Sequence, residues 1–289
     1  MPSIATVTVA GVGLIGGSFA LALRRIGYDG RILGVSSPQT LEIATRLNVI
    51  DEGCAMERAL PQSDLVYMAQ PVERIVEQLG RVRALVPLHA LVTDAGSTKS
   101  AIMQRARALF GEGPHFVGGH PMAGRAGRGV QIAEASLLVD APYALVPTGA
   151  ALPGSPVVDE FLGFLDAMGC RHRVMRAEEH DQVVAWTSHL PQLLSTALAS
   201  AIGDRLEDGR DLEIAGDGLR DMTRLAASPH EVWSGILRTN QVPIDEALEA
   251  VTRELQGLRK ALKAGLAEDH FRRGQRLQSR IAGASGRPR

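Results

Sequence analysis

The stretch Gly11-Val12-Gly13-Leu14-Ile15-Gly16 decides the fold, because it links a strand-forming segment, 4–10, to a helix-forming segment, 17–25. Segment 4–10 is rich in Val, Ile and Thr, which is typical of a buried parallel strand, and a second such segment follows at 31–35. A strand, GxGxxG, a helix and a second strand form the pattern that binds a dinucleotide pyrophosphate at the helix N-terminus. The sequence therefore predicts an α/β, Rossmann-type doubly wound domain, whose cofactor contacts include Gly11, Gly13, Leu14, Ile15 and Gly16.

The end of segment 31–35 bears on which dinucleotide is bound. NAD sites usually place Asp or Glu here to bind the ribose 2′-hydroxyl, whereas this chain has Ser36 and Ser37. Without a carboxylate to repel a 2′-phosphate, we expect NADP to suit the site at least as well as NAD, and to be slightly favoured. No arginine follows immediately that could bind the phosphate, so NAD stays open.

Three further strands are predicted at 64–69, 90–93 and 115–119. Ligands of doubly wound sheets bind beyond the carboxyl ends of the strands, so the loops that follow should border one cleft. Gln70, Pro71 and Asp94 are the expected cofactor contacts in these loops, and Ser97 could either cap the next helix or point into the cleft.

The third loop contains Gly118-Gly119-His120-Pro121-Met122-Ala123-Gly124, which we expect to be a strand end turning into a loop. Its glycines would let the backbone approach a ligand, and an imidazole exchanges protons near neutral pH. His120 is therefore a candidate catalytic residue, although an exposed histidine in a turn would give the same pattern.

Strand patterns recur at 142–146 and 171–175, and from Ala177 onward the sequence is helical in character. We therefore expect a dinucleotide-binding domain over 1–176 and an all-helical domain over 177–289. In the helical part, Pro191 should kink a helix beside His189, which either lines a pocket or is hydrogen-bonded in the core.

Two arginines and a capping motif stand out further along. Arg224, between apolar neighbours, is a candidate for bidentate binding of a carboxylate, whereas Arg220 is expected to form a surface ion pair with Asp217 or Asp221. Ser228 is expected to be the N-cap of a helix. The last helix carries an apolar stripe from Ile244 to Leu266 that either the domain or a second subunit must cover.

Composition excludes several classes of function. The 289 residues include 31 basic and 32 acidic side chains and are only 4% aromatic, so nothing favours a nucleic acid or membrane partner. Cys54 and Cys170 are isolated, which predicts free thiols and no metal site. No apolar run approaches the ~20 residues of a membrane span, so a cytoplasmic protein is expected.

Taken together, the motifs GVGLIGGS, DAGSTKS, GGHPMAG, EEHD, SHLP and DMTRLAASPHEVW resemble the prephenate/arogenate dehydrogenase family in order and approximate spacing. The resemblance covers nearly the whole chain. It implies an NAD(P)-dependent oxidative decarboxylase with a helical domain that dimerises. It also implies that His120 accepts the proton of the substrate's C4 hydroxyl, that Ser97 hydrogen-bonds this hydroxyl and His120, that Arg224 binds a carboxylate, and that His189 lines the pocket.

Two positions depart from the family pattern and bear on the substrate. Gln192 stands where many prephenate-using members have His, and Arg125 replaces a small hydroxyl residue. Both are expected near the substrate, and they leave prephenate and arogenate open.

Two other functions remain as alternatives. One is a dehydrogenase of the 3-hydroxyacid type, with Lys99 as its catalytic lysine, and the other is a non-catalytic dinucleotide sensor.

Overall fold

The computed structural model describes residues 3–111, 113–125, 127–206 and 209–285. The chain forms two compact units, Met1–Gln241 and Val242–Arg289. Within the described ranges, no helix combines the length and the apolar character that a membrane crossing requires.

The first unit is built on a sheet in which the described residues form eight strands in the order β3-β2-β1-β4-β5-β6-β7-β8. Neighbouring strands are parallel except β6 and β7, which are antiparallel. The strands are β1 (Thr6–Ala10), β2 (Arg31–Val35), β3 (Glu52–Gly53), β4 (Leu65–Met68), β5 (Leu91–Asp94), β6 (His115–Pro121), β7 (Pro142–Pro147) and β8 (Arg171–Val174).

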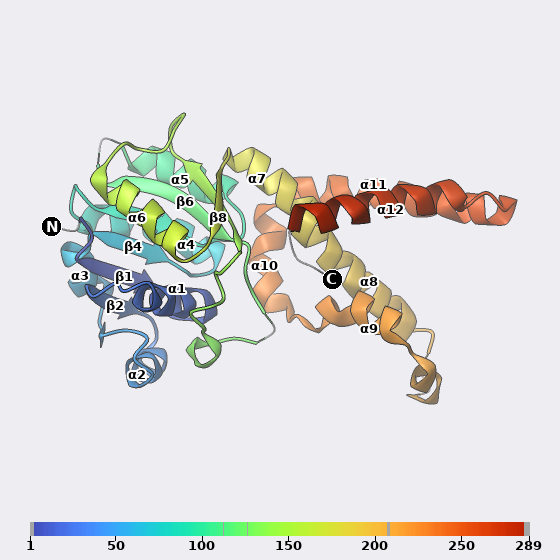
Figure 1. Cartoon of the computed structure of the whole chain (residues 1–289), viewed down its shortest axis with the longest axis horizontal. Helices are drawn as coiled ribbons and strands as arrows, with labels where there is room; N and C mark the ends of the chain where they lie inside the picture. Colours follow the sequence, from blue (N-terminus) through green and yellow to red (C-terminus); the bar gives the residue numbers. More distant parts are fainter. Residues whose placement is uncertain (1–2, 112, 126, 207–208, 286–289) are drawn as a thin grey trace. The chain divides into compact units, whose positions relative to one another are not determined.

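Helices cover both faces of this sheet (Figure 1). On one face α1 (Leu14–Arg25) and α6 (Pro156–Ala167) bury side chains such as Phe19, whose ring stacks on that of Tyr67 at 3.8 Å between centroids. On the other face lie α3 (Met56–Ala59), α4 (Val72–Leu85) and α5 (Ser100–Leu109). The predicted doubly wound α/β class is confirmed. The other short elements here are α2 (Pro38–Arg46) after β2, η1 (Leu60–Gln62) before β4 and η2 (Val130–Ile132) before β7.

Strand β6 is longer than the sequence predicts, and His120 lies in it rather than in a loop. The reason is the pairing with β7, in which His120 is opposite Ala144 and Pro121 opposite Tyr143. A Cβ at Gly119 would overlap the carbonyl oxygen of Asp94 in β5. This glycine therefore permits a close approach of the neighbouring strand, not of a ligand as expected.

No strand follows β8 in the described residues, as the helical pattern predicts. A π-helical turn at Ala185–His189 separates α7 (Ala177–Val184) from α8 (Leu190–Gly203), and this is the irregularity expected beside Pro191. The remaining elements of this unit are η4 (Gly209–Ile214), α9 (Asp217–Thr223), η5 (Arg224–Ala227) and α10 (His230–Thr239). The domain boundary at 176/177 stays a prediction.

The second unit contains most of α11 (Gln241–Ala264) and all of α12 (Glu268–Ser285). The helix with the apolar stripe is therefore not the last one, because Gly265 with φ +70 ends it and a further helix follows. Leu255, Leu262 and Leu266 of the stripe are exposed.

Candidate active site

The glycine-rich loop has the shape that a dinucleotide requires. Gly11 has φ +97, and a Cβ there would lie against Ala69. A Cβ at Gly16 would overlap the carbonyl oxygen of Gly11, so this residue lets α1 pack closely on the loop. A Cβ at Gly13, the N-cap of α1, would meet nothing within 4 Å, so the helix N-terminus is open to a phosphate.

The other predicted cofactor residues at this sheet edge differ in what they offer. Leu14 and Ile15 are half-buried in the first turn of α1, and Pro71 is exposed as the N-cap of α4. The buried Oε1 of Gln70 has no hydrogen-bond partner among the described residues, which fits a donor group of a bound cofactor. Ser37 caps α2 by accepting a hydrogen bond from the Thr40 backbone nitrogen at 3.3 Å, whereas Ser36 is half-buried.

The side chain of Asp94 is already paired within the protein, and its contact with the cofactor stays a prediction. Its carboxylate is fully buried and accepts hydrogen bonds from the backbone nitrogens of Gly96 at 2.8 Å and Gly119 at 3.1 Å. It also forms an ion pair with Lys99, whose Nζ donates to the carbonyl oxygen of Gly119 at 2.7 Å. The ion pair is fully buried, and it links the end of β5 and Gly119 of β6 to the start of α5.

His120 is 8% exposed and begins a chain of three hydrogen-bonded side chains. Its Nδ1 lies 2.8 Å from Nε2 of His180, and Nδ1 of His180 lies 2.8 Å from Oδ1 of Asp181. The chain thus leads from β6 to α7. Sequence reasoning assigned no such role to His180 or Asp181.

The carboxylate of Asp181 is anchored at the N-terminus of α5. It accepts hydrogen bonds from the backbone nitrogens of Lys99 at 2.7 Å and Ser100 at 2.8 Å, two amides that the helix itself leaves unpaired. Burial alone raises the pKa of Asp181, but hydrogen bonds from His180, Ser100 and Lys99 outweigh it and hold the pKa below its usual value. Asp181 is therefore ionised at neutral pH.

The ionised Asp181 fixes the proton positions on both histidines. A carboxylate only accepts, so His180 carries its proton on Nδ1 and, when neutral, offers a lone pair at Nε2. His120 must then donate from Nδ1, which leaves its Nε2 as the free base. Burial, followed by the charges of His180, Lys99 and His189, lowers the pKa of His120 well below its usual value. The site therefore presents an unprotonated nitrogen at neutral pH.

His189 lies in the π turn and is 1% exposed. Burial lowers its pKa to about 4, although Asp181 nearby acts in the opposite direction. Its ring meets that of Trp233 edge-on, with centroids 6.0 Å apart.

Arg224 begins η5, and its side chain is exposed. None of the described residues forms a hydrogen bond or ion pair with its guanidinium, which leaves it open to a carboxylate. Arg220 pairs with Asp217 at 3.7 Å, as predicted.

The buried Gln192 holds the turn of Arg224 in place. Its Nε2 donates to the carbonyl oxygen of Leu225 at 2.9 Å and to Oγ1 of Thr196 at 3.2 Å. Ser195 adds a second tie, because its Oγ accepts a hydrogen bond from the Ala226 backbone nitrogen at 3.1 Å. The amide nitrogen of Gln192 is therefore committed to η5, and its contact with substrate stays a prediction.

Arg125 is exposed and forms an ion pair with Glu134 at 3.0 Å, while its guanidinium also donates to the carbonyl oxygen of Ile132 at 2.5 Å. The guanidinium of Arg125 is thus held by its own loop. Its expected proximity to the substrate stays a prediction.

The structure rules out one of the two roles considered for Ser97, and the predicted N-cap at Ser228 is wrong. Ser97 does not cap α5, because Lys99 is the N-cap and the carboxylate of Asp181 supplies the hydrogen bonds. The half-buried Ser97 hydroxyl has no recorded hydrogen bond within the described part of the chain. Ser228 does not cap α10 either, because its Oγ accepts a hydrogen bond from Nε1 of Trp233 at 3.0 Å.

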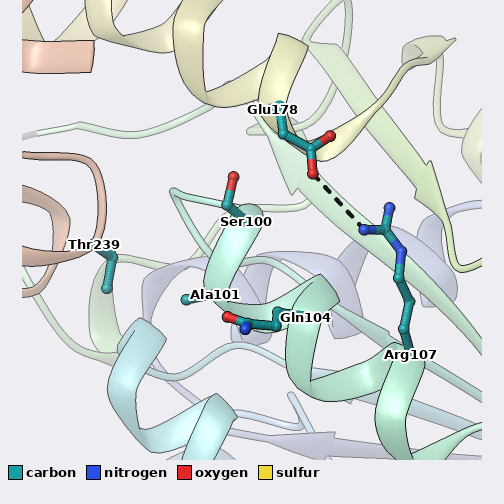
Figure 2. Close-up of a pocket in the computed structure, with 6 residues that line it drawn as sticks. All are labelled: Ser100, Ala101, Gln104, Arg107, Glu178 and Thr239. Carbon is teal, nitrogen blue, oxygen red and sulfur yellow. Dashed lines mark ion pairs between the residues drawn. The ribbon is translucent and has the colours of Figure 1, made fainter. Parts of the chain in front are cut away.

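A surface pocket lies beside the start of α5, lined by Ser100, Ala101, Gln104, Arg107, Glu178 and Thr239 (Figure 2). The side chains of Arg107 and Glu178 form an ion pair at 3.8 Å on one side of it. His120 and Arg224 are not among its lining residues, so this pocket is separate from the candidate active site.

Comparison with known proteins agrees with this geometry. Residues 19–174 match the model of the prephenate dehydrogenase nucleotide-binding domain, and residues 176–276 match that of the prephenate dehydrogenase dimerization domain. The chain belongs to the prephenate dehydrogenase family. The prephenate dehydrogenase of Bacillus subtilis is 32% identical over 272 residues, which cover 92% of this chain and 72% of that protein.

Solved structures give the same family. The arogenate dehydrogenase of Synechocystis has 30% identity and a TM-score of 0.79, with 96% of this chain and 99% of that chain covered. The prephenate dehydrogenase of A. aeolicus, solved with hydroxyphenyl propionate and NAD+, has 27% identity and a TM-score of 0.86, with 96% and 98% covered.

Proposed function

We propose that this chain catalyses the oxidative decarboxylation of prephenate, arogenate or both, with NAD(P) as the hydride acceptor. The observation that carries the proposal is the hydrogen-bonded chain from Asp181 through His180 to His120, which leaves a neutral base at Nε2 of His120. This base lies on β6, which β4 and β5 separate from β1 in the sheet. The carboxyl end of β1 leads into the glycine-rich loop. Family membership supports the same reaction.

His120 performs the proton transfer in this proposal. Its Nε2 accepts the proton of the substrate's C4 hydroxyl as the C4 hydride leaves. Loss of the C1 carboxylate as carbon dioxide then makes the ring aromatic and places the electron pair on the C4 oxygen, to which His120 returns the proton to give the phenol. When bound, the nicotinamide supplies the acceptor for the C4 hydride. His120 can pass its Nδ1 proton to Nε2 of His180, and the resulting imidazolium is stabilised by Asp181 at 2.8 Å.

Other side chains bind and orient the substrate. Arg224 supplies an unpaired guanidinium for a substrate carboxylate, and Ser97 lies after the carboxyl end of β5, where its hydroxyl can reach the C4 oxygen. In this proposal His189 also contacts the substrate. Because alignment of the C4 hydrogen with the hydride acceptor controls the rate, these contacts act mainly through orientation.

The cofactor and the assembly follow from further features. We favour NADP slightly over NAD, because the loop after β2 has Ser36 in place of a carboxylate that would repel a 2′-phosphate. We also propose a homodimer formed through the C-terminal helices, since residues 176–276 match a dimerization domain and leucines of α11 are exposed.

The 3-hydroxyacid alternative requires Lys99 to reach a substrate. Lys99 is fully buried and engaged with Asp94 and Gly119, so its ammonium has no route to one in this structure. A sensor would need no base of the kind that His120 provides.

The test is a two-by-two assay of prephenate and arogenate against NAD+ and NADP+, following the absorbance of the reduced nicotinamide. We expect turnover with at least one pair, and a kcat lower by about 10²-fold or more when His120→Asn replaces the wild type. Reduced cofactor with neither substrate would refute the proposal, and silencing by Lys99→Ala together with full activity of His120→Asn would favour the 3-hydroxyacid type.

A further inference from the structure

The buried amide of Asn240 links the main chain of Asp181 in α7 to the ring of His189 in the π turn that follows. Asn240 is 2% exposed and follows the last residue of α10. Its Nδ2 donates to the main-chain carbonyl oxygen of Asp181 at 2.8 Å and lies 3.1 Å from Nδ1 of His189. The same residue, Asp181, thus orients His180 through its carboxylate and Asn240 through its carbonyl.

The orientation of this amide is determined by chemistry. The atom that reaches the carbonyl oxygen of Asp181 must donate, because a carbonyl oxygen only accepts. It is therefore the NH₂ group of Asn240, and its second hydrogen points to His189. Nδ1 of His189 must accept this hydrogen, so the neutral ring carries its proton on Nε2.

We infer that Asn240 is a positioning residue that fixes His189 as a hydrogen-bond donor, with Nε2–H presented to an oxygen of the substrate. The two histidines then have opposite roles: Nε2 of His120 accepts, and Nε2 of His189 donates. No described residue is recorded as a hydrogen-bond partner of Nε2 of His189, which leaves this donor for a ligand.

Burial agrees with a neutral donor. A protonated His189 would turn Nδ1 into a second donor facing the amide of Asn240, and burial already lowers the pKa of His189 to about 4. The titratable groups that act on it are Asp181 and His180. The contact with substrate rests on the proposed function, whereas the tautomer does not.

The first experiment measures the tautomer without substrate. Full-length protein labelled with ¹⁵N-histidine is studied by two-dimensional ¹H–¹⁵N NMR, and the His189 signals are assigned by their loss in His189→Gln. We expect Nδ1 of His189 to show the chemical shift of an unprotonated nitrogen and Nε2 that of a protonated one at neutral pH. The reverse pattern, or a fully protonated ring, overturns the inference.

The second experiment compares variants. Asn240→Leu removes both donors, so we expect the fixed tautomer to be lost and kcat/KM to fall by about tenfold, the upper end of what a neutral hydrogen bond contributes. Thr239→Val is the matched control, because it removes a hydrogen bond of 2.7 Å to Thr98 Oγ1 at the same helix end without touching a histidine.

The control should keep the wild-type tautomer and change kcat/KM by less than about twofold, a difference of only ~0.4 kcal/mol, because the bond it removes joins Thr239 to Thr98 and to no histidine. Equal losses in Asn240→Leu and Thr239→Val, or an unchanged tautomer in Asn240→Leu, would overturn the positioning role. If the wild type turns over no cyclohexadienyl substrate, the proposed function fails, while the NMR result still decides the tautomer.

Discussion

Nδ1 of His120 in β6 lies 2.8 Å from Nε2 of His180 in α7, although the two residues are 60 positions apart in the chain. This contact joins the sheet to the first helix of the helical segment. Because Asp181 fixes the protons on both rings, the relationship determines which nitrogen of His120 is free to act as a base.

Replacing His120 with Asn should abolish proton transfer while keeping the shape of the site. We expect kcat to fall by about 10²-fold to 10⁴-fold, the usual contribution of a positioned base. The dissociation constant of NADPH, measured by fluorescence titration, should stay within about twofold of wild type, since a factor of two is only ~0.4 kcal/mol. Loss of cofactor binding to the same extent as kcat would show that His120 has a structural role instead.

Asp181→Asn tests the proton order along the chain. The amide that replaces the carboxylate can present an NH₂ group to Nδ1 of His180, which would move the proton of His180 to Nε2. The proton on Nδ1 of His120 would then have no acceptor. We expect a fall in kcat of about 10²-fold or more, with the acid limb of the pH–rate profile displaced.

Glu178→Gln is the matched control for Asp181→Asn, because Glu178 lies on the same helix and forms only a surface ion pair with Arg107 at 3.8 Å. This variant should keep wild-type kcat. Comparable losses in the two variants would assign the effect of Asp181→Asn to a general disturbance of α7.

Two glycines of the loop after β1 should separate cofactor binding from folding. At Gly13 a Cβ meets nothing within 4 Å, so Gly13→Ala should fold normally but weaken NADPH binding by about tenfold or more, ~1.4 kcal/mol, through the space needed by the pyrophosphate. At Gly16 a Cβ overlaps Gly11, so Gly16→Ala should lower the free energy of unfolding by about 1–3 kcal/mol. Urea unfolding and NADPH titration of both variants measure the two effects, and identical behaviour of the pair would contradict this division.

The sequence predicts the parts of this site that local patterns encode. The glycine-rich loop lies directly between β1 and α1, so strand, turn and helix signals identify it without tertiary information. His120 is also found locally, through its proline and glycine neighbours. His180, Asp181 and Asn240 act through distant partners, 51 to 82 residues away, and no periodicity or motif chemistry specifies which partner each will meet.

Asp94 and Ser97 also show what local patterns leave undetermined, namely which polar groups at the sheet edge are already paired. Asp94 ends β5 and Ser97 follows it, at the sheet edge where ligand contacts are expected, yet the carboxylate of Asp94 is enclosed by Lys99 and two backbone amides. The cap expected from Ser97 is supplied by Asp181, a side chain distant in sequence. Position along the chain thus predicts the sheet edge but not which polar groups there are already paired.

Lys99→Met should destabilise the fold rather than act on chemistry alone. It leaves the carboxylate of Asp94 buried without its ion-pair partner, which typically costs about 3–5 kcal/mol. Denaturant unfolding should show this loss, and the double variant Lys99→Met/Asp94→Asn should recover part of it by removing the unpaired charge. Wild-type stability of Lys99→Met would mean that the pair contributes nothing to folding.

His189 should make stability depend on pH in a defined window. Its pKa is about 4 in the folded protein and ~6.5 when unfolded, so between these values the unfolded chain binds a proton that the folded chain does not. The contribution of His189 to the free energy of unfolding is therefore fully present above pH ~6.5 and is lost as the pH falls toward about 4, amounting to ~3 kcal/mol.

His189→Gln lacks this titration, so its free energy of unfolding should decline less than that of wild type between pH ~7.5 and ~4.5 in urea titrations. His120 has the same sign of shift and is present in both proteins, so its contribution cancels except for the part that His189 adds to lowering the pKa of His120. Parallel declines of the two proteins would show that His189 is not held neutral by burial.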